Sequence, residues 1–183
     1  VDELQVAVER DRSGGVRRAA LEELARRGDK SALDYAETIF GRPDFPYRDR
    51  ALAADILLDE QGVDVADEFI DVALKAPTPE FLRNHLAGLL AELKDEGVDK
   101  KLVKLIGKGK AQQKVFALHS TVNVNDPKLL KRIRKGLRDK QEEVVVATVD
   151  ALIARRDRES IEDLEKLFEK SKLDGVRAAA LRG

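Results

Sequence analysis

The chain has 183 residues, enough for one domain of ordinary size, and its 34 basic and 35 acidic side chains exclude a uniformly basic nucleic-acid-binding protein. It contains no cysteine, which excludes disulfides, thiol catalysis and thiolate metal sites, and no apolar run reaches the roughly 18 residues of a membrane span. A hydrophobic share of 43% is too high for a disordered chain.

Apolar residues recur at helical spacing along the whole chain, and glycine or proline interrupts them at regular intervals. After an opening helix, the pattern predicts pairs of helices. In chain order the predicted helices cover about 1–12, 16–27 and 30–40, 47–60 and 64–76, 80–95 and 98–106, 111–122 and 127–138, 142–156 and 159–170, and a last one begins at 174. Helix formers dominate, and the one β-branched run, Val144–Val146, lies in a segment that is helical by its position, so we expect an all-α protein.

One pattern returns at a fixed interval. Residues 16–29 read VRRAALEELARRGD, with Gly28 ending a helix and Asp29 placed to cap the next. Related runs follow at 144–157 (VVVATVDALIARRD) and 176–183 (VRAAALRG), at offsets of 128 and 160 residues. Both offsets are multiples of 32, and a fixed period of this size is typical of stacked helical repeats.

The second helices keep the same register. Three apolar residues of 98–106 align with three of 127–138 at an offset of 31; the aligned pairs are Val98 with Leu129, Leu102 with Ile133, and Ile106 with Leu137. In the first helices we expect Val16, Ala20, Leu21 and Leu24 to face inward, and likewise Phe81 and Leu82. Asp126 is expected to cap the helix that starts at Pro127.

Each helical hairpin has one apolar stripe per helix and is too small to bury it alone, so we expect neighbours to stack into a solenoid. The expected fold class is an all-α superhelix, with 1–183 as a single repeat domain. Its repeats are about 16–46, 47–79, 80–110, 111–140 and 141–173, with partial repeats at 1–15 and 174–183. Because the chain begins at Val1 and lacks methionine, we expect a piece excised from a longer protein.

The period alone also allows ankyrin or tetratricopeptide repeats, but the chain lacks a TPLH-type turn and has only two Tyr and no Trp. The run V-R-x-A-A-L-x-x-L-A-x-x-G-D, followed by a second helix, resembles the short HEAT repeats typified by the phycobilisome-lyase group. This resemblance implies a right-handed superhelix whose second helices line the concave side. It implies little about activity, since most such repeats are binding scaffolds.

The near-neutral total charge hides a polarised sequence. Residues 1–96 contain 13 basic and 22 acidic residues, whereas residues 97–140 contain 13 basic and 3 acidic residues. On the second helices of the third and fourth repeats, the basic residues lie off the apolar stripe. We therefore predict a partner-binding ladder on the concave face, formed by Lys100, Lys101, Lys104, Lys108, Lys128, Lys131, Arg132, Lys135 and Arg138. The alternative is a solvated face with clustered charge.

The leading functional prediction is a non-catalytic scaffold that binds a protein or acidic peptide through this ladder. An alternative is binding of duplex nucleic acid through the same residues; the only aromatic residue of the block is Phe116, so base stacking is not expected. A third hypothesis is a bilin-lyase-type enzyme subunit, which is suggested by the family name alone. A spacer segment within a larger protein is a fourth.

We expect no catalytic residue, no cofactor and no metal site. His85 and His119 are not at equivalent repeat positions, and neither has an acid at motif spacing, so both are predicted to be structural. No phosphate loop, nucleophile elbow or metal-binding motif is present. No membrane association is expected, the oligomeric state is left open, and the compartment is left open with the cytoplasm slightly favoured.

Overall fold

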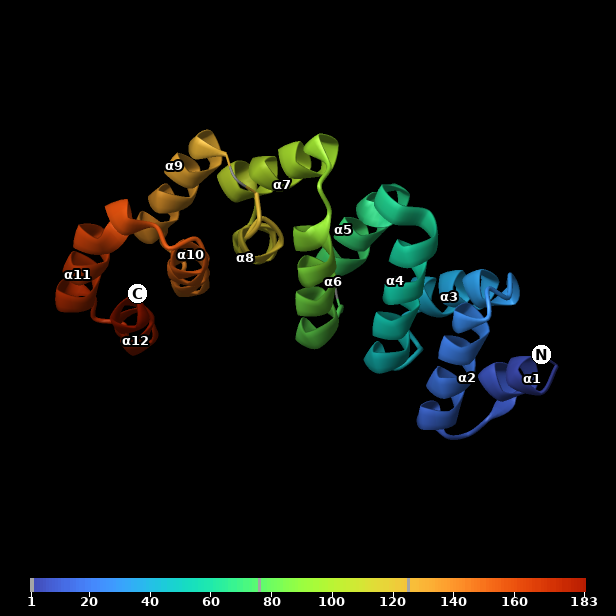
Figure 1. The fold of residues 1–183 in the computed structure, drawn as a ribbon. Helices are drawn as coiled ribbons and strands as arrows, with labels where there is room; N and C mark the ends of the chain where they lie inside the picture. The colour runs from blue at the N-terminus through green and yellow to red at the C-terminus, as the bar shows by residue number, and fades with distance from the viewer. Residues whose placement is uncertain (1, 76, 125) are drawn as a thin grey trace. The chain divides into compact units, whose positions relative to one another are not determined.

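The computed structural model describes residues 2–75, 77–124 and 126–183, and over these residues it contains helices and no strand. The protein is therefore all-α, as predicted. The α-helices are α1 (Asp2–Arg10), α2 (Gly14–Arg26), α3 (Ser31–Gly41), α4 (Tyr47–Gln61), α5 (Ala66–Leu74), α6 (Glu80–Glu92), α7 (Glu96–Lys108), α8 (Ala111–Ser120), α9 (Pro127–Lys135), α10 (Glu142–Ala154), α11 (Ile161–Lys170) and α12 (Asp174–Arg182) (Figure 1). Short 3₁₀ helices are η1 (Gly62–Val65), η2 (Gly136–Arg138) and η3 (Arg158–Ser160). None of the described helices combines the length and apolarity needed to cross a membrane.

Tertiary contacts divide the chain into two compact parts, an N-terminal half, Val1–Leu89, and a C-terminal half, Leu90–Gly183. Within each half, helices pack mostly against their neighbours in sequence. In the N-terminal half α2 contacts α1, α3 and α4, and in the C-terminal half α8 contacts α7 and α10. This arrangement is consistent with a helical repeat. The single repeat domain expected over the whole chain stays a prediction.

The apolar stripes of α7 and α9 are buried as the 31-residue alignment predicted. Val98, Leu102 and Ile106 are buried on α7; Leu129 and Ile133 are buried on α9, and Leu137 on η2. The predicted helix boundary at Asp126 is also confirmed, because its Oδ1 accepts the backbone N–H of Lys128 at 2.8 Å. Gly28 ends α2 with φ +66°, a conformation that glycine adopts without strain.

Two predictions of inward-facing residues were wrong. Val16 is 44% exposed and Phe81 is 56% exposed. On α2 the buried residues are Ala20, Leu21 and Leu24. In the turn before them Arg17 is partly buried, with its side chain 21% exposed, whereas Val16 at the start of the helix is exposed. On α6 the buried residues Leu82, Leu86 and Leu90 follow one another at intervals of four, and Phe81 lies about 100° around the helix from Leu82. Phe81 instead packs against Tyr47, with ring centroids 5.0 Å apart.

A recurring arginine joins each first helix of the N-terminal half to the helix before it. Arg17, Arg50 and Arg83 are spaced 33 residues apart near the starts of α2, α4 and α6. Their guanidinium groups donate to the carbonyls of Asp11 at 3.0 Å, Phe40 at 2.9 Å and Ala73 at 3.1 Å, which lie at or just past the ends of α1, α3 and α5. Carbonyls at a helix C-terminus lack helical partners and favour a cation.

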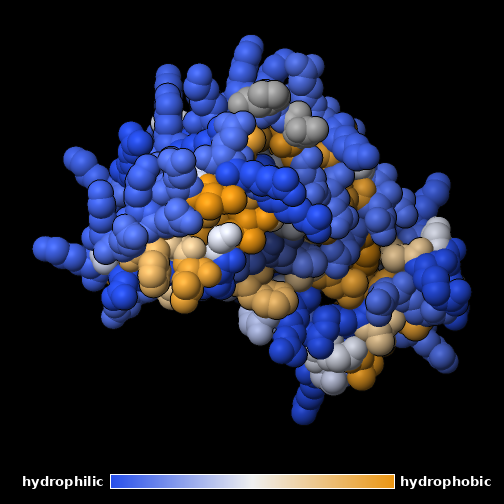
Figure 2. All heavy atoms as spheres, turned by 60° about the vertical axis from the view of Figure 1, so that its left-hand side comes forward, coloured by the Kyte–Doolittle hydropathy of each residue, from blue (hydrophilic) through white to orange (hydrophobic). Residues whose placement is uncertain are grey.

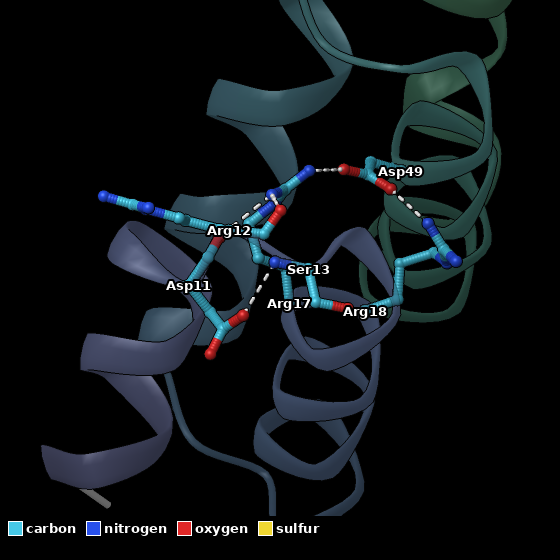
Figure 3. Close-up of polar contacts among 6 residues, drawn as sticks. All are labelled: Asp11, Arg12, Ser13, Arg17, Arg18 and Asp49. Carbon is cyan, nitrogen blue, oxygen red and sulfur yellow. Dashed lines mark hydrogen bonds and ion pairs between the residues drawn. The ribbon is translucent and has the colours of Figure 1, made fainter.

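Asp49 on α4 forms an ion-pair contact with α2. Its carboxylate is buried and accepts from Arg17 Nη2 at 2.8 Å and from Arg18 Nη1 at 2.7 Å, as Figure 3 shows. Arg17 and Asp49 are 32 residues apart, which equals the predicted period. The same separation joins Arg182 to Asp150 in the C-terminal half. Side-chain contacts thus recur at the sequence period within both halves.

His85 on α6 is hydrogen-bonded to Asp55 on α4, with Nε2 and Oδ1 2.8 Å apart. This bond raises the pKa of His85 above its ordinary value, against the opposing effect of burial. The protonated form is therefore favoured by folding. Its stabilising contribution is complete below the ordinary histidine pKa of about 6.5 and is lost as the pH rises through the raised value.

We predict a stability difference that depends on pH and on His85. The unfolding free energy of the wild type, minus that of His85→Gln, should fall by on the order of 0.5 kcal/mol between pH 6 and pH 8, the scale of a partly exposed ion pair. Urea denaturation at both pH values measures it. Asp55→Asn should abolish the same pH dependence; an unchanged profile in both variants would remove this pair as its source.

Candidate binding cleft

A cleft of about 940 Å³ opens on the C-terminal half, a volume in the range of ligand-binding pockets. Its walls are the end of α6 with the loop that follows, one face of α7, the segment around Asn123 and Val124, and two side chains of α9. Asn123 Nδ2 donates to the carbonyl of Ala91 at 3.0 Å and joins two of these walls. Figure 2 shows that hydrophilic side chains cover most of the face of the molecule drawn there, with hydrophobic atoms in the hollows between them.

Local sequence explains how α7 and α9 present charge to this cleft. Each helix is capped by an aspartate: Asp95 Oδ1 accepts the N–H of Val98 at 2.8 Å, as Asp126 does for Lys128. Each helix buries its apolar stripe, so the polar residues between face outward. On α7, Lys100, Lys104 and Lys108 follow one another at intervals of four and therefore share one face.

The structure brings together five of the nine predicted ladder residues. Lys100, Lys104, Lys108, Arg132 and Lys135 line the cleft. The other four are exposed but are not among the residues that line it: Lys101, Lys128, Lys131 and Arg138. The predicted ladder is thus split between the cleft and other surfaces of the same helices.

The basic end of the cleft is formed by Lys104, Lys108, Arg132 and Lys135. Arg132 Nη1 donates to the carbonyl of Val103 at 3.0 Å, and a Cβ placed on Gly107 would lie 3.4 Å from the same nitrogen. The guanidinium of α9 is therefore held against the C-terminal part of α7. Among the described residues, none of these four cations has a carboxylate in ion-pair contact.

The start of α7 and the loop before it give the cleft an acidic end, which contains four carboxylates and one cation: Glu92, Asp95, Glu96, Asp99 and Lys94. Glu96 Oε1 lies 2.8 Å from Lys100 Nζ, and this hydrogen bond raises the pKa of Lys100. Asp99 is half-buried; burial raises its pKa, and the charges of Asp95 and Glu96 raise it further. The sequence did not predict this acidic end, because the acidic residues before Gly97 lie in the acidic segment 1–96 and were grouped with it.

Two other cations of this half are tied into the fold. Lys114 Nζ pairs with Asp139 Oδ2 at 2.6 Å and lowers the pKa of that carboxyl. Arg134 pairs with Asp157 at 2.5 Å and with Glu159 at 2.6 Å, and it lowers the pKa of Asp157. These pairs link α8 to the segment after η2, and α9 to the segment around η3. They show that the basic segment supplies structural contacts as well as cleft residues.

The described residues contain no cluster of three or more His, Cys, Asp or Glu side chains arranged to hold a metal ion. In comparisons with known proteins, no family model matched the chain and no curated protein matched it. The cleft is therefore interpreted from its own geometry and charge.

Proposed function

We propose that the chain is a HEAT-like helical repeat that acts as a non-catalytic interaction module, and that its C-terminal half binds an acidic segment of a protein partner. The single observation that carries this proposal is the convergence of Lys104, Lys108, Arg132 and Lys135 on one cleft without carboxylate partners among the described residues. The recurrence of sequence and of the arginine contacts at about one period supports the stacked repeat.

Four like charges in one cleft repel one another, and carboxylates from a partner lower that energy. Arg132 is suited to this role because its planar guanidinium offers several donors, of which one binds the carbonyl of Val103. The lysines add mobile charges that adapt to the positions of different carboxylates. An acidic peptide therefore matches the basic end in both charge and hydrogen bonding.

The same cleft disfavours duplex nucleic acid, the alternative from the sequence. A duplex presents a negative charge about every 1.7 Å along its axis. Such a ligand, lying along the cleft, would bring phosphates against Glu92, Glu96 and Asp99. Like charges at an interface cost several kcal/mol and exclude partners. A peptide is able to place its acidic groups at the basic end alone.

A non-catalytic role is consistent with the chemistry of the lining. The described residues that line the cleft include no Ser, Thr, Tyr or His, so among them the groups able to act as nucleophile or proton carrier are carboxylates and lysine amines. The carboxylate of Asp95 is occupied by its capping hydrogen bond, and that of Glu96 by Lys100. The groups that line the cleft give no support to the bilin-lyase hypothesis.

Reversing the cations of the basic end should weaken binding of a fluorescein-labelled, glutamate-rich peptide by about tenfold or more, since several ion pairs of up to about 1 kcal/mol each are lost. The test variant carries Lys104→Glu, Lys108→Glu, Arg132→Glu and Lys135→Glu. Fluorescence anisotropy at low salt measures the affinity, with circular dichroism to verify folding.

The four ladder residues outside the cleft provide a control with the same change in charge. Reversal of Lys101, Lys128, Lys131 and Arg138 should reduce affinity far less, through long-range attraction only. Equal losses in both variants would mean that net charge, not the cleft, captures the peptide. Tighter binding of a duplex DNA than of the peptide, with a steep dependence on salt, would favour the nucleic-acid alternative.

A further inference from the structure

The cleft is not uniformly basic; its charge changes sign along α7. Four carboxylates lie at and before the first turn of the helix, where Lys94 also lines the cleft, and a fifth, Asp126, lies at the cap of α9. The four cations of the basic end lie in the second half of α7 and on α9. Lys100, at the border, is paired with Glu96. The cleft therefore has two charged ends of opposite sign. The acidic segment of the proposed partner would contact the basic end and leave the acidic end without a partner.

Asp99 is a partly buried carboxylate of the acidic end. It lines the cleft and is half-buried, and among the described residues no cation is in ion-pair contact with it. Burial raises the pKa of Asp99, and the charges of Asp95 and Glu96 raise it further. A partly desolvated carboxylate beside two like charges is stabilised by an external cation.

We propose that the cleft recognises a dipolar peptide segment, with a Lys or Arg side chain against Asp99 and acidic side chains against Lys104, Lys108, Arg132 and Lys135. This inference rests on the proposed function and specifies its partner. Asp99 and Lys108 are nine residues apart on one helix, or about 14 Å at 1.5 Å per residue. An extended peptide covers that distance in about four residues.

The test compares four labelled peptides. Two segregated peptides, one for each chain direction, have two lysines separated from three glutamates by about four residues of glycine and serine. An interleaved peptide has the same composition with its charges mixed, and a lysine-free peptide replaces the lysines of the segregated design by serine. At least one segregated peptide should bind about fivefold more tightly than the interleaved and the lysine-free peptides, the scale of one partly buried ion pair.

Asp99→Asn should remove this preference, and Asp99→Lys should invert it in favour of the lysine-free peptide. The backbone N–H of Asp99 bonds the carbonyl of Asp95 in every variant, so α7 keeps that hydrogen bond. Glu96→Gln is the matched control: it removes one negative charge from a side chain that is already paired, and should reduce the preference less.

The outcomes separate this inference from the function on which it rests. Equal binding of all four peptides, lost on reversal of the basic end, would overturn the dipolar partner and leave the acidic-segment proposal standing. Failure of all four peptides to bind at low salt would overturn both. A segregated-peptide preference that persists in Asp99→Asn would overturn the role assigned to Asp99.

Discussion

Replacing Asp49 by alanine should lower the free energy of unfolding by about 3 kcal/mol. Its side chain is 4% exposed and accepts hydrogen bonds from two guanidinium groups, those of Arg17 and Arg18. Removing one partner of a buried ion pair is strongly destabilising because the remaining charge stays desolvated. The effect should lie at the lower end of the usual 3–5 kcal/mol range, because the arginine side chains are 21% and 30% exposed and water reaches them.

Urea denaturation followed by circular dichroism measures this loss, with an unchanged m-value as evidence that the same transition is compared. Asp59→Ala is the matched control, since Asp59 is an exposed aspartate of the same helix α4; its effect should stay within about 0.5 kcal/mol. A loss below about 1 kcal/mol for Asp49→Ala would show that Arg17, which also donates to the carbonyl of Asp11, is sufficiently paired without the carboxylate.

The features that sequence predicted are those set by periodicity along one helix. The all-α class, the buried stripe through Leu102 and its equivalent through Ile133 depend only on which residues share a helix face. The cap at Asp126 depends on a few adjacent residues. These properties are local, so a window of the sequence contains the information that determines them.

The features that sequence missed depend on how neighbouring helices are offset. Arg50 is buried although a charged residue near a helix start reads as solvent-exposed, because the carbonyl that it binds belongs to the preceding helix. Val16 was assigned inward because its spacing from the buried Ala20 fits a helix face, but in the first turn of α2 Val16 is exposed and Arg17 is the partly buried residue. Relative offset is a tertiary property and leaves no mark in the periodicity of a single helix.

The charges that meet in the cleft were also not predictable from the periodicity of single helices. The predicted ladder contained nine cations, chosen by their positions on two helices. In the fold, five of these nine line the cleft. It grouped Glu92 and Glu96 with the acidic first half of the chain, although the fold places them in the same cleft as Lys104 and Lys108. A net charge over a window predicts attraction at long range, whereas a binding site is defined by the charges that share one surface.

Phe69→Ala should lower the free energy of unfolding by about 4 kcal/mol, within the 3–5 kcal/mol expected for truncating a buried phenylalanine. Phe69 on α5 is completely buried and packs edge-on against Phe40 of α3, with ring centroids 5.2 Å apart. The truncation removes this aromatic contact and leaves a cavity between the two helices, which both lie in the N-terminal half.

Phe81→Ala removes the same atoms from a residue that the sequence assigned to the core and that the structure leaves 56% exposed against Tyr47. Its effect should be below about 1 kcal/mol, because little apolar surface is returned to water and no cavity is formed. Circular dichroism during urea denaturation compares the two variants directly. Equal losses would place Phe81 in the core after all, and would restore the inward face that the sequence alone assigned to α6.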